Sequence, residues 1–229
     1  MMPGIEYESD PPVNDTPVTP YKTVLRKLLP DFLLKERGIY LRLGPKAGAK
    51  YMRLRLLRAV GANASKPAIP KTSRSFLFVC FGNIMRSPMA EALLKQELSN
   101  RSRNESVTVT SAGLHATPGN VAHPWALAAA ADFNISLEKH RAQLLTAEMV
   151  RDADAIFAMD FQNKAELLTL YPESKHKIFM LSSCLRGHGQ HGEIADPYFG
   201  DVEATRNCYR TLQTCVQNLA DDLFLPATR

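Results

Sequence analysis

The segment from Ser75 to Leu94 constrains the fold of this chain most, because it joins an apolar strand to the start of a helix. Residues 76–79 are continuously apolar, which is typical of a strand that is buried on both faces of a parallel sheet. A helix is expected over Ser87–Leu98, with Ser87 as its N-cap and Pro88 at its first position. The segment therefore predicts a strand, a short turn and a helix in direct succession.

The turn between this strand and this helix carries Cys80, Gly82, Asn83 and Arg86. A short strand-to-helix turn directs successive backbone N–H groups into one concavity, and the helix N-terminus adds partial positive charge. Gly82 permits a positive φ there, and Asn83 tolerates a left-handed backbone. An anion of phosphate size would fit this concavity, and Arg86 could bind two of its oxygens. The turn therefore predicts a phosphate site.

Cys80, at the end of the strand, is expected to lie beneath the bound anion. Backbone N–H groups, Arg86 and the Ser87 hydroxyl would hold its sulfur as a thiolate, which is a nucleophile for phosphoryl transfer. Cys and Arg at this spacing alone would also fit a buried structural cysteine and a surface arginine. The combination of strand, Gly, Asn, Arg, Ser-Pro and helix in register favours the catalytic interpretation.

The rest of the chain after Ser75 alternates between strand and helix patterns. Further strands are expected over 107–110, 155–159 and 177–181, and helices over 124–133, 161–171 and 203–224. Such alternation predicts an α/β fold of three layers, α/β/α, with a four-stranded parallel sheet between the helices. Ligands in these sheets bind beyond the carboxyl ends of the strands, where Cys80 falls.

The first 71 residues differ from the rest in charge. They contain 13 Lys and Arg against 6 Asp and Glu, a net charge of +7, whereas residues 72–229 contain 15 against 17, a net charge of −2. We therefore divide the chain into an N-terminal extension, 1–71, and a catalytic domain, 72–229. Within the extension we expect a disordered tail over Met1–Pro20, a basic helical arm over Tyr21–Gly61 and a linker over Ala62–Ser73.

The basic arm has apolar residues at helical spacing over 24–29, before Pro30, and again over Lys50–Val60. In the second stretch, one helical face carries Met52, Leu56, Ala59 and Val60. Two interpretations stay open. The arm binds an anionic membrane surface or a protein partner, or it packs on its own domain with its arginines in solvent. Binding of nucleic acid is a weaker alternative.

A second motif, Asp196-Pro197-Tyr198-Phe199-Gly200-Asp201, precedes the last predicted helix. A leaving phenolate or alkoxide must be protonated, so a cysteine nucleophile needs a general acid nearby. Asp196 is the candidate for that acid, and Tyr198 and Phe199 would form aromatic walls of a substrate cleft. Taken alone, an Asp-Pro dipeptide is also a common turn.

Residues 79–91 closely resemble the phosphate-binding loop of the low-molecular-weight protein tyrosine phosphatases, and the Asp196 motif resembles the acid loop of the same family. The resemblance extends from about Ser73 to the C-terminus and does not cover the first seventy residues. It implies a flavodoxin-like fold and hydrolysis of phosphotyrosine, an aryl phosphomonoester, through a phosphocysteine intermediate. It also implies that no metal or other cofactor takes part.

The resemblance further implies a role for single residues. Cys80 would be the nucleophile, Arg86 would bind the phosphate, and Asp196 would protonate the leaving oxygen and then deprotonate the attacking water. The rest of the phosphate-binding loop would be Phe81, Gly82, Asn83, Ile84, Met85 and Ser87. A supporting hydrogen-bond network would include Ser111 and His140. The substrate cleft would be lined by Leu114, His115, Thr117, Tyr198 and Phe199.

Two positions in the resembling region depart from the family pattern. Met85 stands where many members carry a second cysteine, so a protective disulfide with the nucleophile is expected to be missing. The segment 114–118, Leu-His-Ala-Thr-Pro, stands where many members carry an aromatic residue that stacks on phosphotyrosine. The preference for tyrosine over a small phosphorylated metabolite therefore stays open.

Two further alternatives concern the chemistry. A thioredoxin-coupled arsenate reductase shares this loop but needs redox cysteines after the 155–159 strand, and residues 155–170 contain none. A silent phosphate-binding module would need neither a thiolate nor an acid. Cys184, Cys208 and Cys215 lack paired spacing, which favours structural thiols and a cytoplasmic location. His188 and His191 are interpreted as residues of a solvated loop rather than metal ligands.

Overall fold

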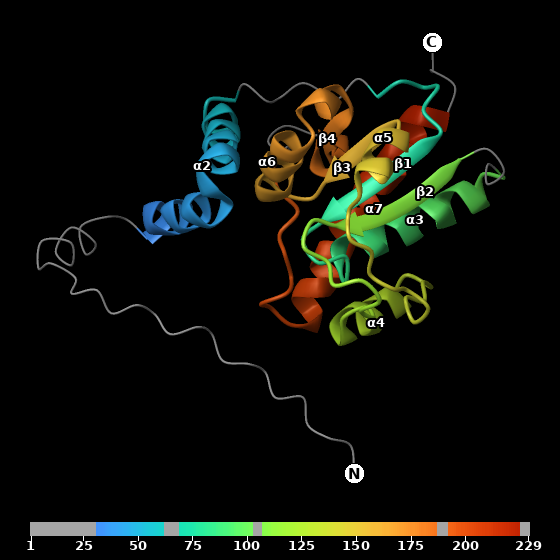
Figure 1. Ribbon diagram of the computed structural model, residues 1–229. Helices are drawn as coiled ribbons and strands as arrows, with labels where there is room; N and C mark the ends of the chain where they lie inside the picture. Colours follow the sequence, from blue (N-terminus) through green and yellow to red (C-terminus); the bar gives the residue numbers. More distant parts are fainter. Residues whose placement is uncertain (1–30, 62–68, 103–106, 187–191, 225–229) are drawn as a thin grey trace, which may run out of the picture. The chain divides into compact units, whose positions relative to one another are not determined.

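The computed structural model describes residues 31–61, 69–102, 107–186 and 192–224 (Figure 1). The predicted tail, the apolar pattern over 24–29, most of the linker, and His188 and His191 lie outside the described residues. The chain divides into two units, Met1–Gly38 and Ile39–Arg229, and the architecture below is that of the second unit. No helix in the described part of the chain is long and apolar enough to cross a membrane.

Four parallel strands form one sheet in the order β2-β1-β3-β4. Their bounds are Ser75–Cys80 for β1, Thr108–Gly113 for β2, Ala155–Ala158 for β3 and Ile178–Met180 for β4. The predicted four-stranded parallel sheet is confirmed. The chain passes from β1 to β2 on one side and then continues to β3 on the other. The crevice between the carboxyl ends of β1 and β3 is therefore the topological switch point, where such folds bind ligands.

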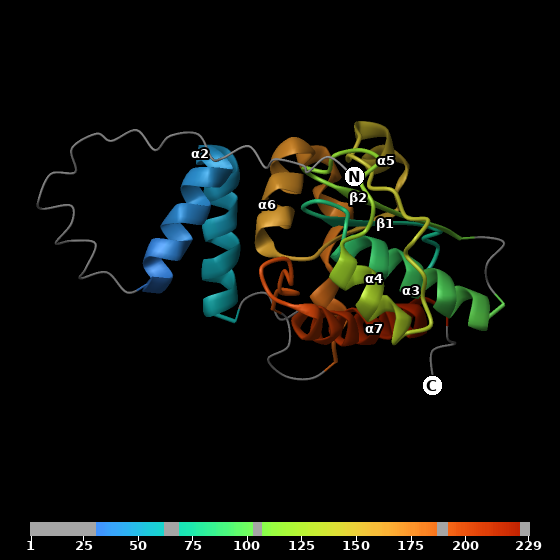
Figure 2. The same cartoon turned by 90° about the horizontal axis from the view of Figure 1, so that it is seen from below.

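Helices cover both faces of this sheet (Figure 2). Three helices lie on one face: α3 (Arg86–Asn100), α4 (Pro124–Ala131) and α7 (Val202–Phe224). The other face carries α5 (Ala147–Asp152) and α6 (Phe161–Leu170). This arrangement confirms the predicted three-layer α/β/α architecture, because a sheet with two apolar faces must be covered on both.

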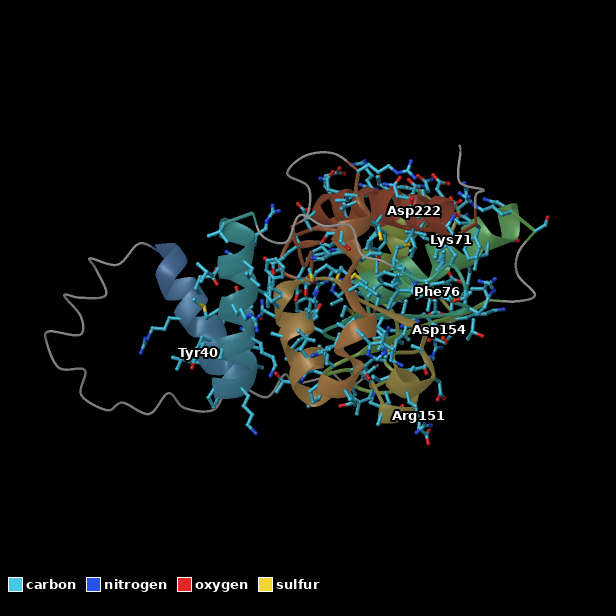
Figure 3. The ribbon with its side chains drawn as sticks, turned by 90° about the horizontal axis from the view of Figure 1, so that it is seen from above. Tyr40, Lys71, Phe76, Arg151, Asp154 and Asp222 are labelled. Atoms are coloured by element: carbon cyan, nitrogen blue, oxygen red, sulfur yellow. The ribbon has the colours of Figure 1, made fainter. Side chains whose placement is uncertain are left out.

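Alternate residues of β1 supply the two halves of the core. Phe76 and Phe78 belong to the cluster beneath α3, α4 and α7, whereas Leu77 and Val79 belong to the cluster beneath α5 and α6. This follows from the period of two in a strand, which directs successive side chains to opposite faces. Figure 3 shows Phe76 inside the crowded core and Arg151 of α5 projecting from the surface, in agreement with exposed side-chain fractions of 0% for Phe76 and 68% for Arg151.

The start of α3 differs from the prediction. The helix begins at Arg86 with Met85 in the N-cap position, so Ser87 is not the cap and Pro88 is the third helical residue. The Ser87 side chain is fully buried and points to the phosphate-loop side chains instead of its own helix. Helix α5 was not expected; Thr146 caps it by accepting a hydrogen bond from the Met149 N–H at 3.2 Å.

The predicted basic arm corresponds to α2, Asp31–Ala59, which is broken at Gly44 (φ 73°) immediately before Pro45. Tyr51, with 2% exposed surface, belongs to the same core cluster as α5 and α6. The predicted face of Met52, Leu56, Ala59 and Val60 is the exposed side of this helix. The arm therefore packs on the domain with its opposite side.

Candidate active site

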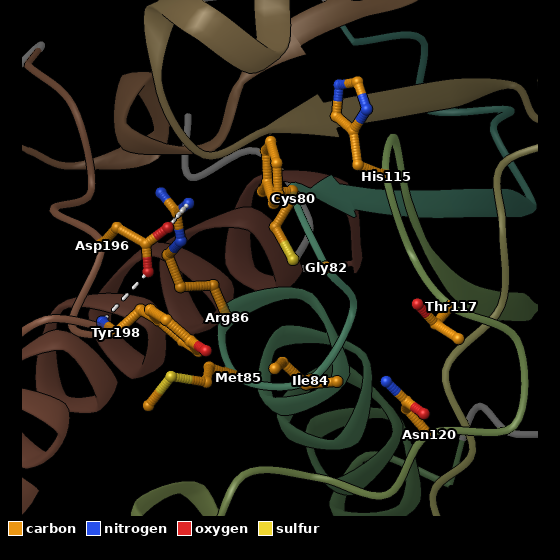
Figure 4. Close-up of a pocket in the computed structure, with 11 residues that line it drawn as sticks. Cys80, Gly82, Ile84, Met85, Arg86, His115, Thr117, Asn120, Asp196 and Tyr198 are labelled. Carbon is orange, nitrogen blue, oxygen red and sulfur yellow. Dashed lines mark hydrogen bonds and ion pairs between the residues drawn. The ribbon is translucent and has the colours of Figure 1, made fainter. Parts of the chain in front are cut away.

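The candidate active site lies at the carboxyl ends of β1 and β3, where Cys80 closes one strand and the start of α3 supplies Arg86. A pocket of about 220 Å³ opens there (Figure 4). It is lined by Cys80, Phe81, Gly82, Ile84, Met85, Arg86, His115, Thr117, Asn120, Asp196 and Tyr198. The fold thus brings the predicted nucleophile, phosphate ligand and general acid to one pocket.

The Cys80 sulfur has two hydrogen-bond contacts within its own loop. Its Sγ lies 3.0 Å from the Ser87 hydroxyl and accepts a hydrogen bond from the Asn83 N–H at 3.3 Å. Asn83 adopts the predicted left-handed backbone, with φ 53°. Gly82 does not have the positive φ that we expected, and a Cβ there would meet only the Ile84 side chain. The Asn83 N–H stabilises negative charge on the sulfur, and the Ser87 hydroxyl adds to this when it is the donor.

Asn83 is the centre of a hydrogen-bond network that holds the loop. Its Nδ2 donates to the hydroxyls of Ser87 (2.8 Å) and Ser111 (2.9 Å), and its Oδ1 accepts from the Gln143 N–H (2.8 Å). Its carbonyl oxygen lies 2.6 Å from the His140 Nε2, which must be the donor. The network thus contains both predicted supporting residues, and it holds Asn83 in a conformation that few side chains adopt.

Gly113, at the end of β2, lets the phosphate loop approach the sheet. A Cβ at this position would lie 2.6 Å from the carbonyl oxygen of Phe81 and 2.8 Å from the nitrogen of Asn83. Directly after the strand, the Leu114 N–H donates to the Cys80 carbonyl (3.0 Å) and the His115 N–H donates to the Phe81 carbonyl (2.9 Å). Only glycine allows this close approach of two backbones.

Arg86 is almost fully buried, with 2% exposed surface, and two carboxylates compensate its charge. Its Nη1 donates to Asp160 Oδ2 at 2.7 Å and to the Ile194 carbonyl at 3.0 Å, and its Nη2 donates to Asp196 Oδ2 at 2.5 Å. Burial works to lower the pKa of the guanidinium, but Asp160 and Asp196 outweigh it and raise the pKa above its ordinary value. Arg86 is therefore a permanent cation.

Asp160 is a residue of the site that the sequence analysis missed. It follows β3 directly and caps α6, because its Oδ1 accepts from the Asn163 N–H at 2.7 Å while its Oδ2 binds Arg86. Two signals could have found it. It is an acidic N-cap, and it ends a strand whose carboxyl end meets the same sheet edge as Cys80.

The acid-loop residues are exposed to different degrees. Asp196 exposes 41% of its side chain and accepts a hydrogen bond from the Tyr198 N–H at 3.3 Å. Tyr198 lines the pocket, whereas Phe199 is 94% exposed and does not. Of the other predicted cleft residues, His115 and Thr117 line the pocket, and Leu114 lies in the core beneath it. Asn120 is a lining residue that the sequence analysis did not name.

One wall of the pocket is an aromatic stack tied to α6. The rings of Phe81 and His115 lie 4.6 Å apart at 28°, and His115 Nε2 lies 2.6 Å from Glu166 Oε2. Tyr198 lies on the other side of the opening, with its ring 5.6 Å from that of His123. These rings give a flat substrate group apolar surfaces to contact.

The other cysteines are placed as structural thiols. Cys208 and Cys215 are buried on α7, and burial raises the pKa of Cys208 to about 12. A thiol with this pKa stays protonated and unreactive at neutral pH. In the described residues, no group of three His, Cys, Asp or Glu side chains could hold a metal ion.

Residues 75–225 match the family described as low molecular weight phosphotyrosine protein phosphatase. The chain is 36% identical over 156 residues to the probable low molecular weight protein-tyrosine-phosphatase EpsP of Ralstonia nicotianae, a match that covers 68% of this chain and 97% of EpsP. It is 35% identical over 147 residues to the protein-arginine-phosphatase of Bacillus subtilis, covering 64% and 95% of the two chains.

A solved structure repeats the fold. The tyrosine phosphatase Wzb from Escherichia coli K30, in complex with sulphate, aligns with a TM-score of 0.60 at 28% identity. The alignment covers 66% of this chain and 99% of Wzb.

Proposed function

We propose that this chain, which belongs to the low-molecular-weight phosphotyrosine protein phosphatase family, hydrolyses phosphate esters of phosphoproteins through a phosphocysteine intermediate. One observation carries the proposal: Cys80, the Asn83 N–H, Arg86 and Asp196 meet at one pocket. A nucleophile, an anion cradle and a proton donor are the parts that two-step phosphoryl transfer requires. A module that only bound phosphate would not need the first or the last.

In the first step, the phosphoryl group binds over Cys80 and takes the place of Asp196 at the Nη2 of Arg86. The Asp160 carboxylate and the Ile194 carbonyl continue to hold Nη1, so the guanidinium keeps its orientation. The Cys80 thiolate attacks phosphorus, and the bond between phosphorus and the leaving oxygen breaks with its electron pair on that oxygen. Asp196, released from Arg86, takes up a proton from solvent and donates it to the leaving oxygen.

In the second step, water attacks the phosphocysteine. Asp196, now a carboxylate, takes a proton from this water, and the sulfur leaves as a thiolate. The Ser87 hydroxyl, 3.0 Å from Sγ, donates to the thiolate as it forms and so stabilises the leaving group. The products are inorganic phosphate and the free enzyme, with every atom of the ester and the water accounted for.

Phosphotyrosine is the substrate that we propose, because the pocket presents flat apolar surfaces beside the phosphate site. The Phe81–His115 stack and Tyr198 can contact an aromatic ring on two sides. Phosphoarginine is the alternative, given the relative named protein-arginine-phosphatase, and a small phosphorylated metabolite is another. Turnover of peptides that carry phosphotyrosine or phosphoarginine, with the two residues in one flanking sequence, decides between the first two.

The mechanism is tested by aryl phosphate hydrolysis in the presence of EDTA. We expect Cys80→Ser to abolish turnover and Asp196→Ala to lower it by about 10²–10⁴-fold, the usual contribution of a general acid. The matched control is Asp201→Ala, an acidic residue of the same loop whose carboxylate accepts from the Ala204 N–H instead of facing the pocket. A wild-type protein that binds vanadate but shows no turnover between pH 5 and 8 would be a phosphate-sensing module.

We place the catalytic domain at residues 72–229 and propose that the N-terminal extension has a function of its own. We propose that its exposed face docks on an anionic lipid surface, so that the enzyme is cytoplasmic and peripheral to the membrane. Met52 and Leu56 of α2 and Val60, the residue after this helix, are 41%, 65% and 66% exposed and follow one another at intervals of four residues. Residues 38–61 contain six Lys and Arg and no Asp or Glu, which complements anionic headgroups.

Sedimentation with vesicles tests this docking. Binding to phosphatidylglycerol vesicles should exceed binding to phosphatidylcholine vesicles, and Leu56→Asp should weaken it at least tenfold. Leu170→Asp, which changes a 59% exposed leucine on α6, is the matched control. Equal binding to both vesicles, or none, refutes the proposal. Self-association that Leu56→Asp abolishes would instead identify an interface between copies of this chain.

A further inference from the structure

The extension makes a direct contact with the segment that carries the proposed acid. Arg55 Nη1 of α2 lies 3.1 Å from Glu193 Oε2, and the two side chains are 39% and 27% exposed. Glu193 precedes Asp196 by three residues. This contact joins parts of the chain that are 138 residues apart. Arg55 lies outside the family match, which covers residues 75–225, whereas Glu193 lies within it.

Glu193 is held from a second direction. Its other carboxylate oxygen, Oε1, accepts a hydrogen bond from the Phe161 N–H at 2.8 Å, at the first residue of α6. A carboxylate at a helix N-terminus is stabilised by the partial positive charge there. Glu193 therefore bridges α2 and the start of α6. Asp160 caps the same helix end and binds Arg86.

Ile194, the residue after Glu193, has hydrogen bonds to the residue that follows β3 and to Arg86 in the active site. The Ile194 N–H donates to the Met159 carbonyl at 2.8 Å, and the Ile194 carbonyl accepts from Arg86 Nη1 at 3.0 Å. Gly192, on the other side, accepts a hydrogen bond from the Ser182 hydroxyl. Residues 192–194 thus form a fixed stem, and Asp196 follows it by two residues.

Beyond the stem, the acid loop is held by the ion pair of Asp196 with Arg86 and by the ring contact of Tyr198 with His123. Tyr198 is 46% exposed and Phe199 is 94% exposed. Once Asp196 has left Arg86, its position depends more on how the stem is held. Since the proposed first step requires Asp196 to leave Arg86 and reach the leaving oxygen, a displaced stem would impair proton donation more than phosphate binding.

We propose that Arg55, acting through Glu193, is a positioning residue for the general acid Asp196, so that the extension is a working part of the active site. This inference rests on the proposed phosphatase function. It assigns to α2 a role in the reaction that does not depend on what the exposed face of this helix binds.

The kinetic test compares aryl phosphates with good and poor leaving groups on the full chain. Proton donation matters more as the leaving oxygen becomes more basic. Arg55→Ala should therefore lower kcat/KM for phenyl phosphate about fivefold or more, and lower it much less for 4-nitrophenyl phosphate. Inhibition by inorganic phosphate should not change. Glu193→Gln, which keeps an oxygen for the Phe161 N–H, should reproduce the effect, and Arg55→Lys should restore most of the activity.

Arg42→Ala is the matched control. Arg42 is another arginine of α2 that contacts the domain, through a 2.8 Å hydrogen bond to Gln162, but it does not touch the stem. The control should leave both substrates unaffected. If Arg55→Ala matches Arg42→Ala, or lowers kcat/KM for both substrates in the same proportion, Arg55 has no positioning role.

The only tryptophan of the chain gives a readout that does not depend on activity. The Trp125 ring lies 4.8 Å from that of His123, which in turn lies 5.6 Å from that of Tyr198 in the acid loop. Arg55→Ala should increase the acrylamide quenching of Trp125, and Arg42→Ala should not. If the wild type proves inactive, the phosphatase proposal fails, and this measurement still decides whether Arg55 holds the loop. Unchanged quenching in Arg55→Ala would overturn the inference.

Discussion

The two loops that build this active site are held in opposite ways. In the nucleophile loop, Cys80, Asn83, Arg86 and Ser87 expose at most 3% of their surface, and each has hydrogen bonds to other buried groups. The acid loop is attached by its stem and exposes most of its outer residues, up to 94% for Phe199. The difference matches the chemistry, because the phosphate cradle must keep one shape while the acid must exchange partners.

Arg86 belongs to both regions, and its removal should have the largest effect. Arg86→Met leaves the Asp160 carboxylate buried without its cation, which should cost about 3–5 kcal/mol in the free energy of unfolding, and should abolish turnover. Urea unfolding and aryl phosphate hydrolysis measure the two effects.

Arg151→Met is the control for this comparison. It breaks a 3.1 Å ion pair with Asp152 in which both side chains are more than two-thirds exposed. Such a pair contributes at most about 1 kcal/mol. A similar loss in both variants would show that the buried pairing of Arg86 is not what stabilises the site.

Gly113→Ala should disturb the nucleophile loop without touching the acid loop. The new Cβ would meet the backbone of Phe81 and Asn83 at less than 3 Å, which neither can avoid. We expect a destabilisation of about 1–3 kcal/mol, as for other overpacked sites, and weaker binding of vanadate.

Gly82→Ala is the matched glycine substitution, because its Cβ would meet only the Ile84 side chain at 3.6 Å and its φ is not positive. Its free energy of unfolding should stay within about 0.5 kcal/mol of the wild type or rise slightly. If both glycine variants lose equal stability, the tight approach at Gly113 is not the cause.

Substitutions in the acid loop should lower activity and leave the stability of the protein nearly unchanged. Tyr198→Ala removes a pocket wall and should lower kcat/KM for aryl phosphates about five- to tenfold, the value of one aromatic contact. The melting temperature should hardly change, because the ring is 46% exposed. Phe199→Ala tests whether Phe199 also belongs to the cleft. We expect a smaller loss of kcat/KM, because Phe199 does not line the pocket. An equal loss in both variants would place Phe199 in the cleft.

His123 contacts both loops, because its backbone N–H donates to the Ile84 carbonyl at 3.0 Å and its ring lies 5.6 Å from that of Tyr198. Its substitution should give the smallest effect. Burial lowers the pKa of this histidine, whose Nδ1 accepts a hydrogen bond from the Trp125 N–H at 3.2 Å. The folded chain thus favours the neutral ring. The contribution of His123 to the free energy of unfolding is present above the ordinary pKa of 6.5 and is lost as the pH falls below it.

The melting temperature between pH 7 and pH 5 measures this dependence. His123→Asn keeps a capping acceptor but does not titrate, so the wild type should lose about 1–2 °C more than the variant over this range. A larger loss in the variant would mean that His123 is protonated in the folded protein.

The sequence predicted the features that arise from neighbouring residues. The strand, the left-handed Asn83 and the sulfur beside its own loop all lie within residues 75–87, so local chemistry was enough. The same kind of reasoning was wrong about Ser87. An N-cap preference is worth about 1 kcal/mol, and the Ser87 hydroxyl instead binds Cys80 and Asn83 in the core. A local preference of this size yields to buried hydrogen bonds.

The sequence by itself determined the four strands, every helix of the catalytic domain except short ones such as α5, the parallel sheet and the composition of the phosphate loop, because periodicity and turn chemistry are local properties. Only the tertiary structure decided that Asp160 meets Arg86, that Gly113 lies beneath Phe81, and that Arg55 reaches Glu193. These partners are 32 to 138 residues apart, since the strand order β2-β1-β3-β4 and the docking of α2 decide which distant residues become neighbours. No local pattern in the sequence carries that information.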